Sequence, residues 1–444
     1  MYSKKILNKN KKIIILLDSN SFDVLINKNN DKAKLILEYS YKDPFIFYRS
    51  PKKTVYDELK KITEFCLIYD ENNNIKLIKY EIENNASTMS FRKKTKDIIE
   101  YAEYFLKRSE LKDSEIELMK LIFILADFTM IDKETPYVLI TSDKNFLNNR
   151  IKLDSDFTFS EINILDINEA IEIMSLFSRF HNLYYIRHND KVNQGLWYDL
   201  AFRNYIPNYS FDEINLKSFS IRFVYLLMSV DEMGYQYYRG VNNDTHDNIM
   251  YYFNYFISLL TGIFDSLALT TNNKCKINFK LDKNPARISL RRTEFLEKVK
   301  EKNLELYQHI NDFLNYINLI YEIRNFVIHR EMFFEQLTID SKNSNGEWKG
   351  SFLKLNIEMY NLFIKLKSKK IIFEGLNDWG LYEKFIDFKC VDMYIFGKRA
   401  LKEIVIFSTK YLSLLGYYNV KSDELPKWLS SSVEIFGKHA LCYY

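Results

Sequence analysis

Apolar and polar residues in the first 187 positions alternate between strand-like and helix-like patterns. Short apolar runs predict four buried strands, at 13–17, 45–48, 137–140 and 162–165. The segments between them have helical periodicity and predict helices over 53–65, 95–108 and 114–131. A further stretch at 66–82, with an Asn-rich centre, predicts an inserted hairpin. Strands separated by helices indicate an α/β domain with a parallel sheet.

The pattern becomes mostly helical after a polar, aperiodic stretch that ends in the first glycine, Gly195. It predicts helices over 218–234, 246–270, 293–330 and 382–415, with a loop or hairpin at 341–350. We therefore expect an all-α bundle with a small insertion. The predicted order is an α/β domain at 1–187, a linker at 188–217, a helical domain at 218–420 and a C-terminal extension at 421–444.

Composition adds exclusions to this picture. The chain has 444 residues, 47% hydrophobic and 27% charged, which suits a globular protein with a large core. Since no glycine precedes Gly195, neither a GxGxxG nor a GxxxxGK[ST] nucleotide-binding loop exists in the first 194 residues. The net charge is only +4, so any attraction to a polyanion must come from local patches.

The cysteines and apolar runs indicate a soluble cytoplasmic protein. The four cysteines have no CxxC or Cys/His spacing, which predicts reduced thiols and no zinc site: Cys66, Cys275, Cys390 and Cys442. The apolar runs are too short for a secretion signal or a membrane span, so we expect no membrane partner.

Carboxylates follow two of the predicted strands. Asp18 comes directly after the run at 13–17, and Asp143 follows the run at 137–140. Glu58 lies one turn into the helix predicted after the second strand. Ligands of α/β sheets bind beyond the carboxyl ends of the strands. Carboxylates gathered there would repel one another unless Mg²⁺ or Mn²⁺ neutralised them, and such a cation activates water for phosphodiester attack.

This arrangement resembles the PIN-domain nucleases over residues 11 to about 180. The matching positions are Asp18-Ser19-Asn20, Glu58 and Thr141-Ser142-Asp143. For the family's remaining acid, Asp113, Glu115 and Glu117 compete, and we assign Asp113. The resemblance implies a metal site of Asp18, Glu58, Asp113 and Asp143. The alternative is that Asp18 and Asp143 only cap the helices that follow them.

The segment RNFVIH in a predicted helix carries different chemistry. Its residues Arg324, Asn325 and His329 form an R-N-x-x-x-H hexapeptide. RNA is cut without a metal when its 2′-hydroxyl attacks the adjacent phosphorus, which requires proton transfer and a cation for the phosphoryl oxygens. A histidine titrates in the range needed to move a proton, and an arginine is a permanent planar donor to phosphate. The alternative is an ordinary bundle helix with a surface arginine and a half-buried histidine.

The hexapeptide resembles that of the HEPN superfamily of helical endoribonucleases, over about 218–420. The resemblance also rests on FDSLAL at 264–269, where the family often presents an acidic residue to the site, here Asp265. It implies cleavage that needs no cofactor. Positions five apart point about 140° apart on an ideal helix. Arg324 and His329 of one copy therefore do not form a compact pair, and we expect the site at a homodimer interface.

The resemblances together predict a two-domain endoribonuclease of toxin or phage-defence type. Its expected partners are RNA, a second copy of the chain and an antitoxin or activating protein. The first domain supplies a second, metal-dependent nuclease activity or regulation. Three local basic clusters could each follow a phosphate backbone or form a solvated helix face. They are RKKTK at 92–96, the lysines Lys365, Lys367, Lys369 and Lys370, and the group Lys280, Lys283, Arg291 and Arg292. The alternative function is a non-catalytic dimer that binds RNA or a protein partner.

Overall fold

The structure is a computed structural model in which the chain divides into two compact units. It describes residues 13–18, 32, 36, 39, 45–49, 63–69, 75–80, 87–90, 137–148, 150, 162–181, 184–185, 191–192, 194–206, 214–238, 243–280, 285–329, 336–343, 346–367, 377–385 and 388–417. The first unit comprises Met1–Val192, Tyr238–Gly240 and Lys342–Trp348, and the second comprises Asn193–Tyr237, Val241–Ser341 and Lys349–Tyr444. The main division, after Val192, falls inside the stretch predicted as a linker.

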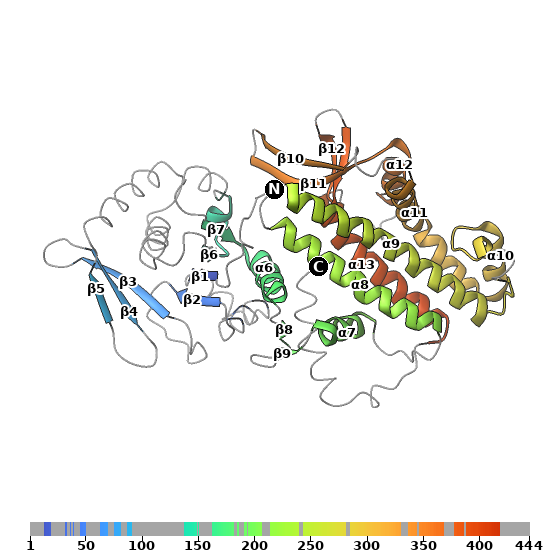
Figure 1. The fold of residues 1–444 in the computed structure, drawn as a ribbon, viewed down its shortest axis with the longest axis horizontal. Helices are drawn as coiled ribbons and strands as arrows, with labels where there is room; N and C mark the ends of the chain where they lie inside the picture. Colours follow the sequence, from blue (N-terminus) through green and yellow to red (C-terminus); the bar gives the residue numbers. More distant parts are fainter. Residues whose placement is uncertain are drawn as a thin grey trace. The chain divides into compact units, whose positions relative to one another are not determined.

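The first unit contains a seven-stranded sheet of order β5-β4-β3-β2-β1-β6-β7 (Figure 1). The strands are β1 (Ile13–Leu17), β2 (Phe45–Arg49), β3 (Thr63–Tyr69), β4 (Ile75–Tyr80), β5 (Ser87–Ser90), β6 (Tyr137–Ile140) and β7 (Ile162–Leu165). The five strands from β3 to β7 in this order pair in parallel, and β4 and β5 extend the sheet in antiparallel fashion. The four predicted strands are confirmed, as is the hairpin, which β3 and β4 form.

Burial explains why these runs form the centre of the sheet. Every residue of β1 is buried, as expected of a parallel strand covered on both faces. Helix α6 (Ile167–Phe180) follows β7 and begins with a capping box between Asp166 and Glu169. The helix predicted at 53–65 is wrong over 63–65, because those residues begin β3 by pairing with β2. Its remainder and the helices predicted at 95–108 and 114–131 lie outside the described residues.

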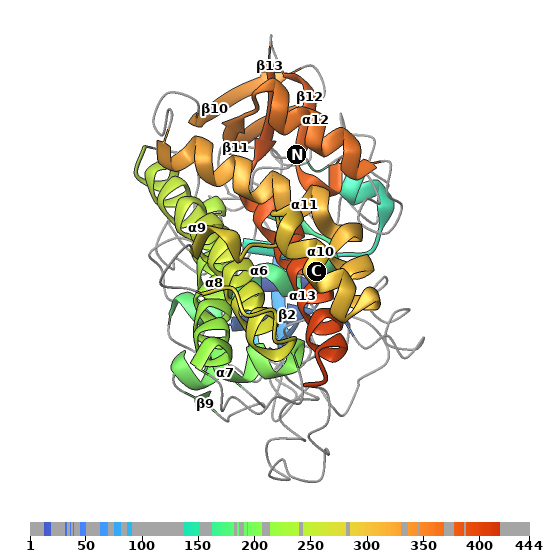
Figure 2. The same cartoon turned by 90° about the vertical axis from the view of Figure 1, so that its right-hand side faces the viewer.

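The second unit is largely helical (Figure 2). Its helices are α7 (Gln194–Tyr205), α8 (Ile214–Tyr237), α9 (Asn243–Lys274), α10 (Thr293–Lys302), α11 (Leu304–His329), α12 (Ile357–Lys367) and α13 (Met393–Leu414). Helices α8 and α9 lie side by side in both views, and α13 packs against α8, α9 and α11. The core forms there: the Phe407 ring of α13 lies 5.6 Å from that of Phe264 and 5.2 Å from that of Phe313.

Helix α9 is long and apolar enough to cross a membrane, by length and composition, and among the described residues it is the one such helix. Two thirds of its apolar window is buried inside the structure. Ile257, Leu260 and Leu267, for example, are almost fully buried. This degree of burial is typical of a core helix.

Three predictions for the second half need correction. The linker predicted at 188–217 is wrong over 194–205, which form α7, because the apolar side chains of Trp197, Ala201 and Phe202 are buried. It is also wrong over 214–217, which begin α8. The helix predicted at 293–330 is two helices, since the Asn303 side chain accepts a hydrogen bond from the Leu306 amide at 2.9 Å and begins α11.

The helix predicted at 382–415 is wrong over 382–385 and 388–392. Strands β12 (Leu381–Phe385) and β13 (Phe388–Asp392) stand there instead. They join β10 (Gln336–Asn343) and β11 (Gly346–Lys354) in a four-stranded sheet of order β10-β11-β13-β12. The insertion predicted at 341–350 is therefore the hairpin of a larger sheet.

Candidate functional site

Helices α9 and α11 bring two of the predicted site residues together. Asp265 lies on α9, and Tyr321 and Arg324 lie three residues apart on α11, so they share one face of that helix. The Tyr321 hydroxyl donates a hydrogen bond to Oδ1 of Asp265 at 2.5 Å. Arg324 is close enough to Asp265 to favour its charged form. The two helices thus meet in a cluster of a carboxylate, a phenol and a guanidinium.

The electrostatics of Asp265 reflect opposing effects. Although the residue is exposed as a whole, the atoms packed around its carboxyl remove solvent and raise its pKa above the usual range. The Tyr321 hydrogen bond and the charges of Arg324 and Arg222 lower that pKa, but burial dominates. Burial and the neighbouring Asp265 in turn raise the pKa of Tyr321, so its hydroxyl stays a neutral donor.

Two further arginines join this cluster. Arg222 of α8 donates hydrogen bonds to Ser218 and, at 3.3 Å, to Ser266 of α9. Its side chain lies against Gly262, where a Cβ atom would come within 2.5 Å of the Arg222 Nε. The Arg291 guanidinium lies 4.8 Å from the centre of the Tyr321 ring. The absence of a side chain at Gly262 therefore lets Arg222 reach α9.

Arg291 is held by α11 on more than one side. Its Nε donates to Oδ1 of Asn318 at 3.0 Å, and its Nη2 lies 3.4 Å from the Glu322 carboxylate. The Arg291 guanidinium is therefore fixed over the Tyr321 ring rather than extended into solvent. Lys280, Arg292 and Lys283 were predicted together with it, but Lys283 lies outside the described residues.

The remaining residues of the hexapeptide occupy the end of α11. Arg324 Nη1 donates to Oδ1 of Asn325 at 3.3 Å, which orients the neighbouring amide. His329 is the last residue of α11, and its side chain lies outside the described part of the structure. The structure thus places Asp265, Arg324 and Asn325 together, and places only the backbone of His329 on the same helix.

Sequence reasoning missed Tyr321 and Arg222 as members of the site. Tyr321 carries a local signal, because it precedes Arg324 by three residues and must share its face of the helix. Arg222 carries none, since its place depends on the packing of α8 against α9.

Two predicted carboxylates of the first unit, Asp18 and Asp143, lie at the carboxyl edge of its parallel sheet. Asp18 is buried directly after β1, and its Oδ2 accepts a hydrogen bond from the Thr141 hydroxyl at 2.8 Å. The Thr141 hydroxyl accepts from the Asp143 amide at 3.0 Å. Oδ1 of Asp143 accepts from the Asn145 amide at 2.7 Å, as in a helix cap. The adjacent strands β1 and β6 therefore bring Asp18 and Asp143 to one short network.

The metal set predicted around these carboxylates is only partly visible. Glu58 and Asp113 lie outside the described residues. Within the described part of the chain, no three His, Cys, Asp or Glu side chains gather closely enough to hold a metal ion. The described carboxylates fit a Mg²⁺ or Mn²⁺ ion in chemistry, since oxygen ligands suit both metals, but Asp18 and Asp143 alone are too few.

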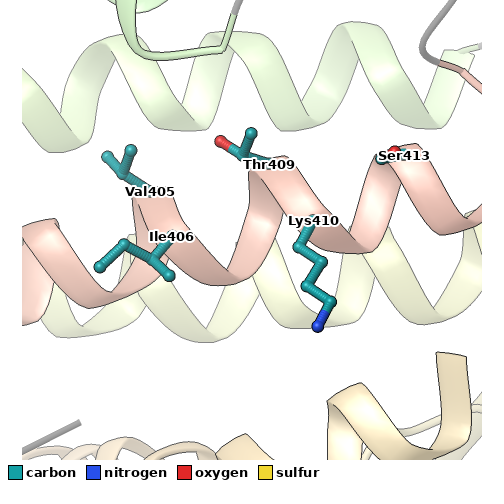
Figure 3. Close-up of a pocket in the computed structure, with 5 residues that line it drawn as sticks. All are labelled: Val405, Ile406, Thr409, Lys410 and Ser413. Atoms are coloured by element: carbon teal, nitrogen blue, oxygen red, sulfur yellow. The ribbon is translucent and has the colours of Figure 1, made fainter. Parts of the chain in front are cut away.

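A shallow groove on α13 does not contribute a second site. It is lined by Val405, Ile406, Thr409, Lys410 and Ser413, as Figure 3 shows. These residues offer one ammonium and two hydroxyls beside apolar groups, without a carboxylate or imidazole to move a proton. The groove therefore lacks the side chains of an acid–base site.

Comparisons of the chain with protein-family models, with curated proteins and with solved structures found no significant match in any of the three.

Proposed function

We propose that this protein is an endoribonuclease that cuts RNA without a metal ion. The observation that carries the proposal is the meeting of Asp265 and Arg324 beside Tyr321 on a solvent-accessible face of α9 and α11. The arginine belongs to the R-N-x-x-x-H hexapeptide, and the aspartate is the acid expected from the resemblance to HEPN nucleases. Arg222 and Arg291 add positive charge to the same cluster, which suits a phosphodiester substrate.

Each residue has a distinct role in this proposal. The RNA 2′-oxygen forms a bond to the adjacent phosphorus while the bond from phosphorus to the 5′-oxygen breaks, leaving a 2′,3′-cyclic phosphate and a 5′-hydroxyl. His329 carries the proton that the 2′-hydroxyl loses to the departing 5′-oxygen. Arg324 stabilises the charge on the phosphoryl oxygens. The charge of Asp265 attracts the Arg324 guanidinium, and the Asn325 amide accepts a hydrogen bond from it.

The complete site requires two copies of the chain. Arg324 and His329 are five residues apart on the single helix α11, and positions five apart on an ideal helix point about 140° apart. A two-fold axis beside the end of α11 allows Arg324 of one copy to face His329 of the other. We therefore propose a homodimer through the helical unit.

The first unit supports a second proposal, a PIN-like domain. Asp18 and Asp143 follow the adjacent parallel strands β1 and β6 and are joined through Thr141. With Glu58 and Asp113, they would hold Mg²⁺ or Mn²⁺ and activate water for a second cleavage reaction. If these four carboxylates do not form a complete metal site, the first unit regulates the nuclease of the helical unit instead.

The resemblance to HEPN and PIN nucleases also gives the biological setting we propose. Such an enzyme acts in the cytoplasm as a toxin or phage-defence effector, and an antitoxin or activating protein controls it. The competing proposal is a non-catalytic dimer that binds RNA or a protein. It is favoured by the capping role of Asp143, which needs no chemistry.

Cleavage of total RNA by the purified full-length protein, with and without EDTA, tests these proposals. We expect cleavage that survives EDTA, yields 2′,3′-cyclic phosphate ends and is lost in His329→Ala and Arg324→Ala. Asp18→Asn serves as the control and keeps this activity. Cleavage abolished by EDTA and by Asp18→Asn would assign the activity to the first unit, and binding of RNA without any cleavage would favour the non-catalytic dimer.

A further inference from the structure

The exposed side of the α8–α9 pair carries tyrosines that lead toward the arginine cluster. Tyr251 and Tyr255 of α9 are 65% and 40% exposed, and Tyr225 of α8 is 44% exposed. The ring centres of Tyr225 and Tyr255 lie 6.5 Å apart, so the two helices present one continuous aromatic surface. We call Tyr225, Tyr251 and Tyr255 the tyrosine platform.

The platform and the arginine cluster belong to one stripe of the helix pair. On α9, residues 251, 255, 258, 262 and 265 recur at helical spacing and share one side. Gly262 in this stripe touches Arg222, and Asp265 ends it beside Arg324. The stripe from Tyr251 to Asp265 is about 21 Å long at the rise of an α-helix.

We propose that single-stranded RNA lies along this stripe, with bases stacked on the tyrosine platform and the phosphate backbone directed to Arg222 and Arg324. The proposal rests on the proposed nuclease function and names how that site receives its substrate. Sequence-tolerant binding of single strands combines aromatic stacking with nearby cations.

Charge favours RNA over a protein partner for this surface. Aromatic side chains alone are also common at protein interfaces. Here the platform continues into guanidinium groups, whereas the acidic pair Asp231 and Glu232 lies at its other end, near Tyr252. A tyrosine phenol is neutral at physiological pH, and burial raises the pKa of Tyr255 further, so this ring does not repel phosphate. The phosphate backbone is therefore favoured toward the arginines and disfavoured toward the acidic pair.

Binding of an uncleavable strand tests this proposal apart from catalysis. The probe is a short fluorescein-labelled 2′-O-methyl oligouridine, which lacks the attacking 2′-hydroxyl, and the readout is fluorescence anisotropy with the full-length protein. Loss of stacking with one base weakens binding about 5-fold to 100-fold. We expect a loss of this size in Tyr251→Ala and in Tyr255→Ala, and near wild-type binding in Tyr255→Phe, which keeps the ring.

The matched control is Ile357→Ala, which removes an exposed apolar side chain, 77% accessible, from α12. It should bind like the wild type, and thermal melting of every variant checks that the fold is intact.

Wild-type affinity in both alanine variants would overturn the proposal. So would a change of these variants to monomers in sedimentation, because the platform would then be a protein interface. Tyrosine-dependent binding without cleavage of natural RNA would instead leave the platform in place and contradict the nuclease.

Discussion

Asp392 shows how a single buried carboxyl ties stability to pH. Its Oδ1 accepts hydrogen bonds from the amides of Tyr394 and Ile395, at 3.0 Å each, and so caps α13. Burial raises its pKa to about 6, which these hydrogen bonds and the charge of Lys398 only partly offset. In the unfolded chain an aspartate has a pKa of about 3.9. Between about pH 4 and pH 6, the folded protein therefore keeps a proton on Asp392 that the unfolded chain has already released.

The sign of the pH dependence follows from this difference. Stability from this group is greatest below about pH 4 and falls as the pH rises through about 6, by on the order of 3 kcal/mol. Asp392→Asn keeps an oxygen for the cap but cannot ionise. We expect its free energy of unfolding in urea to lose this slope and to exceed the wild-type value at pH 8. Asp392→Ala is the contrast, since it also loses the cap, worth about 1 kcal/mol.

Tyr321 is the residue through which the candidate site is most directly tested. Its hydroxyl lowers the pKa of Asp265 by donating a hydrogen bond to the carboxylate. Tyr321→Phe removes that donor and keeps the ring that packs against Phe264 and under Arg291. We therefore expect the pKa of Asp265 to rise further in the variant. The acidic side of the curve of cleavage rate against pH should shift to higher pH together with the pKa of Asp265.

The measurement is an NMR titration of the Asp265 carboxyl, followed by the rate of RNA cleavage against pH. An unchanged Asp265 pKa in Tyr321→Phe would show that the hydrogen bond is absent in solution. Tyr307→Phe, a surface tyrosine near Lys300, serves as the control and should leave the profile unchanged.

The residues of the candidate site differ in how far sequence could predict them. Arg324, Asn325 and His329 stand in one helix, so their spacing alone revealed them. Asp265 was reached through resemblance, because nothing local to α9 links it to α11. Arg222 was not reached, since its place depends on the small residue Gly262 on another helix. Sequence pattern therefore identifies candidate residues that lie in the same helix. It misses residues of other helices that packing brings next to them.

The same division holds for whole elements. The central strands were predicted from short apolar runs because both faces of a parallel sheet are covered. The pattern over β12 and β13 predicts helix wrongly, because these five-residue segments mix apolar and charged residues without a clear period. Their identity as strands depends on pairing with each other and with the distant β11. Cys390, for instance, pairs with Lys354. Short apolar segments remain ambiguous until a partner strand is known.

Close packing of two helices gives a prediction at this scale. At Gly234 of α8, an added Cβ would come within 2.8 Å of the buried ring of Tyr394 on α13. That ring has little room to move, so overpacking costs about 1–3 kcal/mol, while alanine recovers up to about 1 kcal/mol of helix propensity. We expect Gly234→Ala to lower the free energy of unfolding by about 1–2 kcal/mol in urea denaturation.

Gly397 on α13 supplies the matched control. A Cβ there would come within 2.7 Å of the end of the Met233 side chain, which is flexible and can turn aside. Gly397→Ala should therefore change stability by much less than Gly234→Ala. Equal losses in the two variants would contradict the argument that the rigid ring of Tyr394 decides the cost.

At the scale of the whole molecule, mixing two inactive variants tests whether the proposed site is shared between copies. Arg324→Ala and His329→Ala each lack one proposed group on both copies of a homodimer. In a mixed dimer, one copy keeps Arg324 and the other keeps His329, and these two groups face each other across one half of the interface. Subunit exchange at equal concentrations yields about half mixed dimers on statistical grounds. We expect EDTA-resistant cleavage to return, because each mixed dimer restores one of its two halves. If the two halves act independently, the rate should reach about a quarter of the wild-type rate.

The restored rate should fall on dilution together with the fraction of dimer measured by sedimentation. Activity that stays absent in the mixture, although mixed dimers form, would show that Arg324 and His329 must come from the same copy.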